Sequence, residues 1–247
     1  MDLGSLCIVI SSHLYHVSLL ASFPIWGMQV LIASEFVSFV LALILVFFFL
    51  KAYRLVRSLF LVGLPVGFLF LAFSYVFLGI SLICESDPSM SQSFLWLRLT
   101  TQSYGYVFIG FTYYFSTKNE EATRSFLVAV SLASFLSILL PFGILLMMPP
   151  FMKVPSVYVV DDFFRMMNLI LLGYVVYHLV KHLKTSGEPI SGLVWAPSAF
   201  SVLWVGQYSL LLWGIDGSQT ALAFAHVARI VALLLLLRIY YASGRRV

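Results

Sequence analysis

Long apolar stretches, separated by short polar segments, follow one another through most of the chain. A helix of about 20 apolar residues crosses a membrane core of roughly 30 Å, so each stretch of that length is a candidate span. The pattern predicts an all-α, polytopic integral membrane protein with seven transmembrane helices. Their expected ranges are 26–50, 58–83, 93–116, 125–147, 161–184, 191–214 and 220–241.

Residues 1–24 are apolar as well, but polar residues at 11–16 interrupt them and Pro24 ends them. We interpret this part as an interfacial segment on the outer face, with an additional span as the alternative. Asp2 stands where a signal peptide would carry basic residues, so we do not expect cleavage. No linker rich in Pro, Gly or Ser divides the rest, which predicts a single seven-helix transmembrane domain over 25–247.

The composition excludes a water-soluble protein and orients the expected bundle. Hydrophobic residues make up 62% of the chain and charged residues 10%, with a mean hydropathy of +1.02 and a net charge of +4. Because cytoplasmic loops are enriched in Lys and Arg, we expect the N-terminus outside and the C-terminus inside. The basic residues assigned to the inner side are Lys51, Arg54, Arg57, Lys118, Arg124, Lys181, Lys184, Arg238, Arg245 and Arg246. They cap helix ends rather than forming a basic face, so nucleic acid is not an expected partner.

Several polar residues fall inside the predicted spans, where ionisable side chains mark functional sites by default. Asp161 and Arg165 share one helix face at i, i+4, and Asn168 continues that face. We expect three acids to meet three arginines in the outer half of the bundle, with amides completing the hydrogen bonds. The candidate residues are Glu35, Arg98, Gln102, Asp161, Asp162, Arg165, Asn168, Gln207, His226 and Arg229, and Tyr208 is a further hydrogen-bonding candidate.

Two interpretations of these residues remain open. They either form a structural network of ion pairs and amides that locks the helices, or they line an outward-facing polar pocket for a small polar ligand or ion. Donors in excess of the pairs, particularly Arg229 with Asn168 and Gln207, favour the pocket.

The chain also contains signs of an internal duplication, with repeats over 26–116 and 155–241 and a connector helix at 125–147. Parallel triple-helix repeats are a known arrangement of transporters. The alternative is chance, because any two three-helix membrane segments share inner basic residues and a few prolines. The correspondences are Glu35 with Asp162, Arg54 with Lys181, Arg57 with Lys184, Pro65 with Pro197, Phe68 with Phe200 and Arg98 with Arg229.

No pattern in the sequence indicates catalysis, a metal or a cofactor. Neither G-x-S-x-G nor H-E-x-x-H occurs. His178 and His182 have a metal-compatible spacing, but no further ligand is expected at their depth. Haem binding would need paired histidines at equal depth, which we do not expect. From these three points together we predict no enzyme, no metal and no cofactor. A disulfide between Cys7 and Cys84 is compatible with the expected topology.

The layout of seven spans, with an outer N-terminus and an inner C-terminus, resembles that of microbial rhodopsins and prokaryotic seven-helix sensor modules. The last span holds Arg229 and no lysine, so a retinal pigment is not expected. The order of three, one and three spans also resembles the SWEET and PQ-loop transporters, although the chain has no Pro-Gln dipeptide.

These features lead to three functional expectations for a protein of the cell membrane that works in the lipid bilayer. The first is a non-enzymatic sensor or receptor-like protein that passes its signal to a separate membrane protein partner. The second is a small-solute or ion carrier built from the two triple-helix repeats. The third is an accessory structural subunit of a larger membrane complex.

Overall fold

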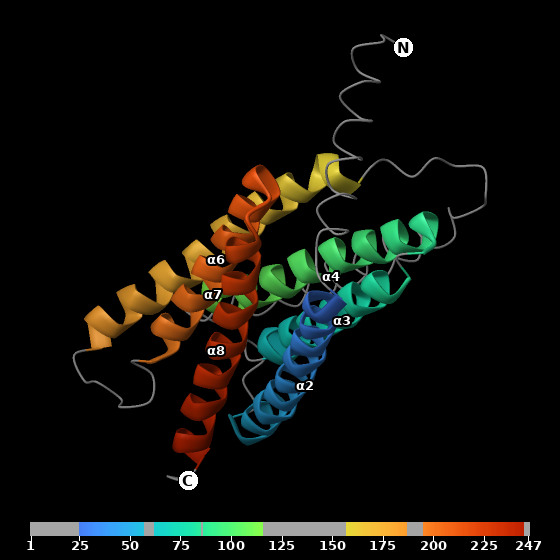
Figure 1. The fold of residues 1–247 in the computed structure, drawn as a ribbon. Helices are drawn as coiled ribbons and strands as arrows, with labels where there is room; N and C mark the ends of the chain where they lie inside the picture. Colours follow the sequence, from blue (N-terminus) through green and yellow to red (C-terminus); the bar gives the residue numbers. More distant parts are fainter. Residues whose placement is uncertain (1–24, 57–61, 85, 116–156, 187–194, 245–247) are drawn as a thin grey trace.

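The computed structural model describes residues 25–56, 62–84, 86–115, 157–186 and 195–244 (Figure 1). Over these residues the chain is helical and contains no strand. The helices are α2 (Ile25–Val56), α3 (Gly63–Ile83), α4 (Pro88–Phe115), α6 (Val157–Ser186), α7 (Trp195–Asp216) and α8 (Gln219–Gly244). Five of them are long and apolar enough to cross a membrane, which makes this a multi-pass membrane protein.

α4 is the helix outside that group of five, because it carries the polar run Thr100–Ser103 in its middle. Six of the seven predicted spans coincide with described helices, and the seventh, at 125–147, lies outside the described residues. The interfacial segment predicted for 1–24 also lies outside them, as does Cys7, the predicted disulfide partner of Cys84.

Of the helices that extend beyond their predicted ranges, α2 and α4 do so for identifiable reasons. α2 continues through Lys51 and Arg54, whose exposed side chains suit a helix end that leaves the apolar region. α4 begins at Pro88 because Asp87 caps it. The Asp87 carboxylate accepts hydrogen bonds from the backbone N–H groups of Ser89, at 3.1 Å, and Met90, at 3.3 Å. Proline suits the first position of a helix, where its missing N–H would have no partner.

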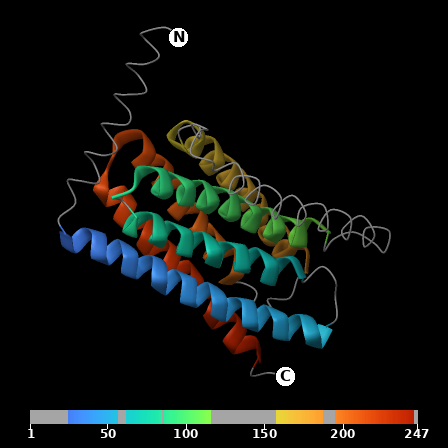
Figure 2. The same ribbon diagram turned by 90° about the vertical axis from the view of Figure 1, so that its right-hand side faces the viewer.

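The six described helices form a closed ring in which each packs against two others (Figures 1 and 2). The order around the ring follows the chain from α2 to α8, and α8 returns to α2. α2, α4, α6 and α8 run in one direction, and α3 and α7 run in the other. Every helix therefore presents one face to the interior of the ring.

The closest helix contact lies between α3 and α4, where two glycines face each other. A Cβ atom added at Gly67 would lie 2.8 Å from the carbonyl oxygen of Gly105, and one added at Gly105 would lie 2.9 Å from the carbonyl oxygen of Gly67. Small residues at such crossings let two backbones approach and gain van der Waals contact in a membrane.

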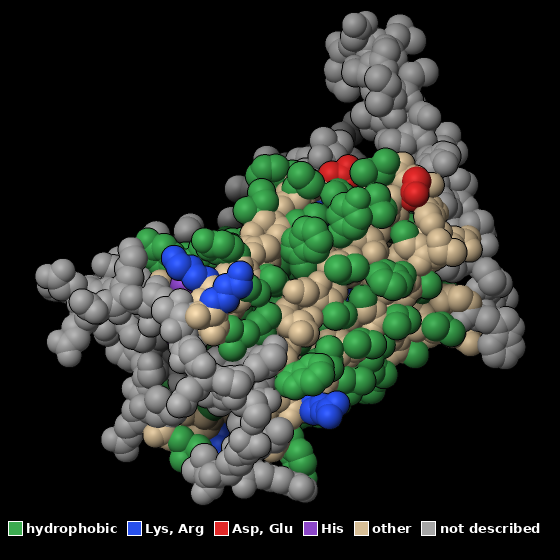
Figure 3. Space-filling view, turned by 90° about the vertical axis from the view of Figure 1, so that its left-hand side faces the viewer, with side chains coloured by type: hydrophobic (Ala, Val, Ile, Leu, Met, Phe, Trp, Pro, Cys, Tyr) green, Lys and Arg blue, Asp and Glu red, His purple; other side chains and the backbone are tan. Residues whose placement is uncertain are grey.

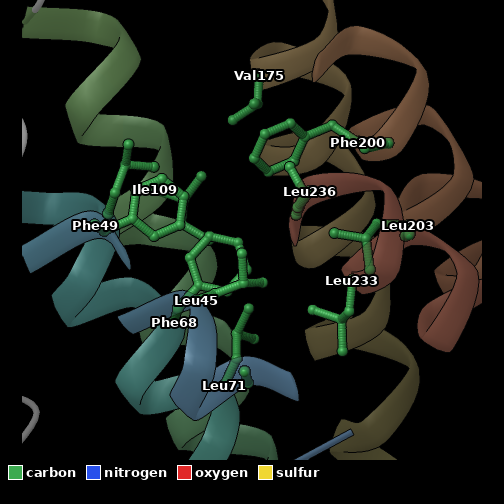
Figure 4. Close-up of a cluster of buried hydrophobic side chains, with 14 of the residues drawn as sticks. Leu45, Phe49, Phe68, Leu71, Ile109, Val175, Phe200, Leu203, Leu233 and Leu236 are labelled. Carbon is green, nitrogen blue, oxygen red and sulfur yellow. The ribbon is translucent and has the colours of Figure 1, made fainter. Parts of the chain in front are cut away.

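An apolar core fills the interior of the ring towards one end (Figure 4). Phe68 and Leu71 of α3 lie with the side chains from α2 and α4, facing Phe200 and Leu203 of α7 with those from α6 and α8. The core occupies the half of the bundle that adjoins the exposed basic helix ends. Those basic residues are Lys51, Arg54, Lys181, Lys184 and Arg238.

The outer surface of the ring is broadly apolar, as lipid contact requires (Figure 3). Large side chains such as Phe47 and Ile170 are exposed on it. In the same view, acidic side chains gather towards one end of the molecule, and basic side chains lie towards the other.

Candidate functional site: a polar layer inside the ring

Buried polar side chains from all six described helices lie beyond the apolar core, on the side away from the basic helix ends. We call this set the polar layer. Each of its members is buried except Asp161, which is partly exposed. The members are Glu35, Tyr75, Arg98, Gln102, Ser103, Tyr106, Asp161, Arg165, Asn168, Gln207, His226 and Arg229.

A two-pronged ion pair joins α2 to α8 within the layer. Nη1 of Arg229 donates to Oε2 of Glu35 at 3.0 Å, and Nη2 donates to Oε1. The Glu35 side chain is 1% exposed and that of Arg229 is 9% exposed, so water screens the pair very little. In addition, the Arg229 guanidinium lies 4.6 Å from the centre of the Tyr75 ring, which adds a cation–π contact with α3.

His226 lies one turn before Arg229 and shares its guanidinium with Glu35. Nδ1 of His226 contacts Nη2 of Arg229 and lies 3.1 Å from Oε1 of Glu35. The imidazole therefore touches both partners of the ion pair. Ser34 adds a contact from α2, since its hydroxyl lies 3.0 Å from Nδ1 and donates to the carbonyl of Leu31 at 2.8 Å.

A second ion pair lies on α6, and it is tied to α7. Nε of Arg165 donates to Oδ2 of Asp161 at 2.6 Å, one turn away on the same face. Nη1 of Arg165 donates to the carbonyl oxygen of Leu210 in α7 at 2.9 Å. The guanidinium also lies 5.6 Å from the Trp213 ring. Arg165 is therefore held from three directions.

Arg98 of α4 differs from the other two arginines. It is 9% exposed and interacts electrostatically with Arg165, Asp161 and Glu35. No carboxylate among the described residues lies within ion-pair distance of it. Asp161 forms an ion pair with Arg165, and Glu35 forms one with Arg229.

The part of the layer that adjoins the apolar core consists of neutral polar groups. Nε2 of Gln207 donates to the hydroxyl of Tyr106 at 3.0 Å, which links α7 to α4. Gln102 lies one turn before Tyr106 on the same helix.

Several buried atoms of the layer have no hydrogen-bond partner among the described residues. Both amide atoms of Asn168 are in this position, although the side chain is 0% exposed. The other atoms are the hydroxyls of Tyr75 and Ser103, Oε1 of Gln207 and Nε of Arg229. A buried polar atom without a partner costs about 1–3 kcal/mol, so these atoms call for a partner that is not part of the described chain.

Helix contacts show that three of these groups lie at a similar depth. The indole of Trp204 donates to the carbonyl of Leu169 at 3.0 Å, and Arg165 reaches Leu210, so Gln207 lies level with Asn168. Trp96 packs on Phe164, and a Cβ atom at Gly110 would lie 3.9 Å from Leu171. Ser103 therefore lies level with Asn168 on the other side.

The structure does not bring all the predicted site residues together. Asp162 is exposed on the outside of α6, and its carboxylate lies near Gly214 of α7. Successive residues on a helix point about 100° apart, so Asp161 and Asp162 cannot both face the interior. The expectation of three acids facing three arginines is thus wrong: two acids do so. Tyr208 also points outwards, where it stacks on Trp204.

Sequence reasoning missed Tyr75, Ser103 and Tyr106, because hydroxyl-bearing residues are common in membrane helices. A signal for Tyr106 was present, since it lies four residues after Gln102 and eight after Arg98 on one face of α4.

His178 and His182 lie near the basic end of α6, away from the layer. Across the part of the chain that the structure describes, no group of three His, Cys, Asp or Glu residues could hold a metal ion.

The polar layer brings charged groups together with neutral hydrogen-bond donors and acceptors. Comparison of the chain with known protein families, with curated proteins and with solved structures found no match.

Proposed function

We propose that this protein is a non-enzymatic, receptor-like protein of the cell membrane that binds a small polar ligand or ion in its polar layer. Binding would change the packing of the helices, and a separate membrane protein would read that change. The observation that carries the proposal is Asn168, a fully buried amide whose two polar atoms have no hydrogen-bond partner in the described part of the chain. A purely structural network would leave such an amide bonded.

The arrangement around Asn168 supports access from one side. The apolar core closes the ring on the side of the basic helix ends, and Asp161 is partly exposed on the opposite side. Under the orientation expected from the basic residues, the open side faces out of the cell.

The proposal is tested by replacing Asn168 with leucine, which has a similar volume and no polar atoms. In the ligand-free protein we expect the melting temperature to stay level or rise, because a buried group without partners is removed. A screen of small polar solutes against the purified full-length protein should find compounds that raise the melting temperature of the wild type. Asn168→Leu should lose that response.

Ser81→Ala is the matched control, because Ser81 is buried in α3 and its hydroxyl is already bonded to the carbonyl of Leu78 at 2.9 Å. This variant should keep the response. A screen in which no solute stabilises the wild type would contradict the proposal, and so would a strong loss of stability in ligand-free Asn168→Leu.

A second candidate function is a small-solute carrier whose two triple-helix halves, α2–α4 and α6–α8, move against each other. Matched burial in the two halves supports it. When a nearly constant number is added to the residue numbers of α3, many of its buried positions correspond to buried positions of α7. The same is true of many buried positions of α2 with α6 and of α4 with α8. Examples are Phe68 with Phe200, Leu71 with Leu203, Leu45 with Val175, Ser38 with Asn168, Tyr75 with Gln207 and Arg98 with Arg229.

The ring of contacts has the same symmetry, because the contact of α4 with α6 corresponds to that of α8 with α2. In this alignment of the two halves, the buried Glu35 corresponds to the buried Arg165 and not to Asp162, which is exposed. A duplication would thus have placed opposite charges at matching positions. Binding sites at the interface of two such halves are usual in carriers.

Flux measurements separate the two candidates. A carrier should move into proteoliposomes the solutes that raise its melting temperature, and Arg229→Ala should abolish that flux by breaking the pair with Glu35. Solutes that bind without crossing the membrane would leave the receptor as the function.

A further inference from the structure

We infer that the ligand of the polar layer is a small monoanion, held by the guanidinium of Arg98. The inference rests on the proposed function and names the chemical class of its ligand. Two independent observations on the described residues carry it: none of their carboxylates lies at ion-pair distance from the buried Arg98, and none of their polar groups bonds the buried amide of Asn168.

The first observation is the charge balance of the layer. Arg229 is paired with Glu35 and Arg165 with Asp161, so no carboxylate of the described helices is left as a counterion for Arg98. Asp162 lies on the outer surface of α6. With three arginines and two carboxylates, the layer carries a positive charge in excess, which an anion would offset.

A buried charge without a counterion is costly, and neighbouring positive charges increase the cost. Arg165 and Arg229 both repel Arg98, whereas Asp161 and Glu35 attract it. An anion against Arg98 would offset this repulsion and would replace the water that the guanidinium gave up on burial. A cation would add to it, so the layer selects against positively charged ligands.

The second observation places neutral groups next to this charge. Arg98, Gln102 and Tyr106 follow one another at four-residue intervals along the interior face of α4. Ser103 and Asn168 lie level with Gln102, and their polar side-chain atoms have no hydrogen-bond partner within the six described helices. An anion bound at Arg98 would thus lie one helical turn from free donors and acceptors.

These groups together suit a carboxylate better than a spherical ion. A guanidinium presents two parallel N–H groups that match the two oxygens of a carboxylate. The Asn168 amide both donates and accepts, which suits a hydroxyl group on the carbon beside the carboxylate. Inorganic monoanions share the charge but would leave the amide oxygen unpaired.

The test uses the purified full-length protein in lipid nanodiscs and measures melting temperature and dissociation constants. The probes are sodium acetate, lactate and glycolate, the inorganic anions chloride and nitrate, and the uncharged analogues acetamide and lactamide. We expect lactate and glycolate to stabilise most, acetate less, and the amides not at all. Chloride or nitrate acting as strongly as lactate would overturn the carboxylate assignment.

The variants are Arg98→Gln and Arg98→Lys, with Arg238→Gln as the matched control because Arg238 lies exposed at the other end of the bundle. Arg98→Gln should weaken lactate binding by about tenfold or more, and Arg98→Lys should retain part of it through its charge. Arg238→Gln should bind as the wild type does. Unchanged binding in Arg98→Gln would overturn the inference.

The outcomes also separate this inference from the proposed function. If only uncharged or cationic solutes stabilise the wild type, and Asn168→Leu abolishes their effect, the proposed function stands and the anion assignment is wrong. If no probe of any charge acts on the wild type, both are wrong.

Discussion

The Glu35–Arg229 pair shows how single side chains make charges tolerable inside an apolar bundle. Each partner is almost fully buried, and each would be costly alone. The two parallel hydrogen bonds and the Tyr75 ring together surround the guanidinium on several sides. Removing either partner alone would therefore leave a buried charge without a counterion and destabilise the fold.

Replacing Glu35 with glutamine should lower the free energy of unfolding by about 3–5 kcal/mol, because Arg229 would keep its charge without a counterion. The double variant Glu35→Leu with Arg229→Leu should be less destabilised than Glu35→Gln, since it leaves no charge behind. Reversible unfolding in mixed micelles measures both.

Asp162→Asn serves as the control for this comparison. Its carboxylate is exposed, so the change should stay within about 0.5 kcal/mol. A double variant that loses more stability than the single one would show that the pair contributes net stability of its own.

Among the helices, the contact of α3 with α4 depends on the absence of side chains. Gly67→Ala would bring a Cβ atom to 2.7 Å from Cγ1 of Ile109, as well as against the backbone of Gly105. We expect a loss of about 1–3 kcal/mol, as in other overpacked interiors. Thermal unfolding monitored by tryptophan fluorescence would report it.

Gly79 of the same helix provides the comparison, because a Cβ atom there would meet nothing within 4 Å. Gly79→Ala should leave stability unchanged or raise it by up to about 1 kcal/mol through helix propensity. Equal effects of the two substitutions would argue against close packing of α3 on α4.

The start of α4 adds a pH-dependent contribution. Hydrogen bonds from the Ser89 hydroxyl and from the N–H groups of Met90 and Ser89 lower the pKa of Asp87 below its usual value. A carboxyl with a lowered pKa stabilises the fold above its unfolded-state pKa, and this contribution disappears as the pH falls through the folded-state pKa.

Asparagine also caps helices but does not titrate, so Asp87→Asn should remove this acid dependence and leave the helix capped. Melting temperatures at pH 7 and at pH values below the usual aspartate range would compare it with the wild type. Parallel curves for the two proteins would count against a role for the carboxylate charge.

Across the described helices, the exposed basic side chains lie at one end of the ring, whereas Asp87, Asp162 and Asp216 lie near the helix ends on the other side. Figure 3 shows the same separation of acidic and basic side chains on one face. This separation predicts that the turn from α7 to α8 lies outside the cell and the end of α6 inside. In a variant with both native cysteines changed to serine, Asp216→Cys should react with an impermeant maleimide on intact cells. Lys184→Cys should react only after permeabilisation, and the reverse result would invert the orientation.

The pattern of apolar stretches was sufficient to predict a helical, multi-pass membrane protein. The reason is physical: without water in the membrane core, backbone groups must bond within their own segment, so local composition decides the helix. Helix ends were less predictable, because Lys51 can leave the apolar region on a long side chain and Asp87 can start α4 early.

Tertiary packing decided which polar residues meet. Glu35 and Arg229 lie far apart in the sequence and are joined only because α8 returns to α2. Likewise, Asp161 and Asp162 are neighbours in the chain, yet the rotation of α6 turns one into the ring and the other out of it. Periodicity assigns residues to faces of a helix, but which face looks inwards depends on the neighbours, and these are set by the fold as a whole.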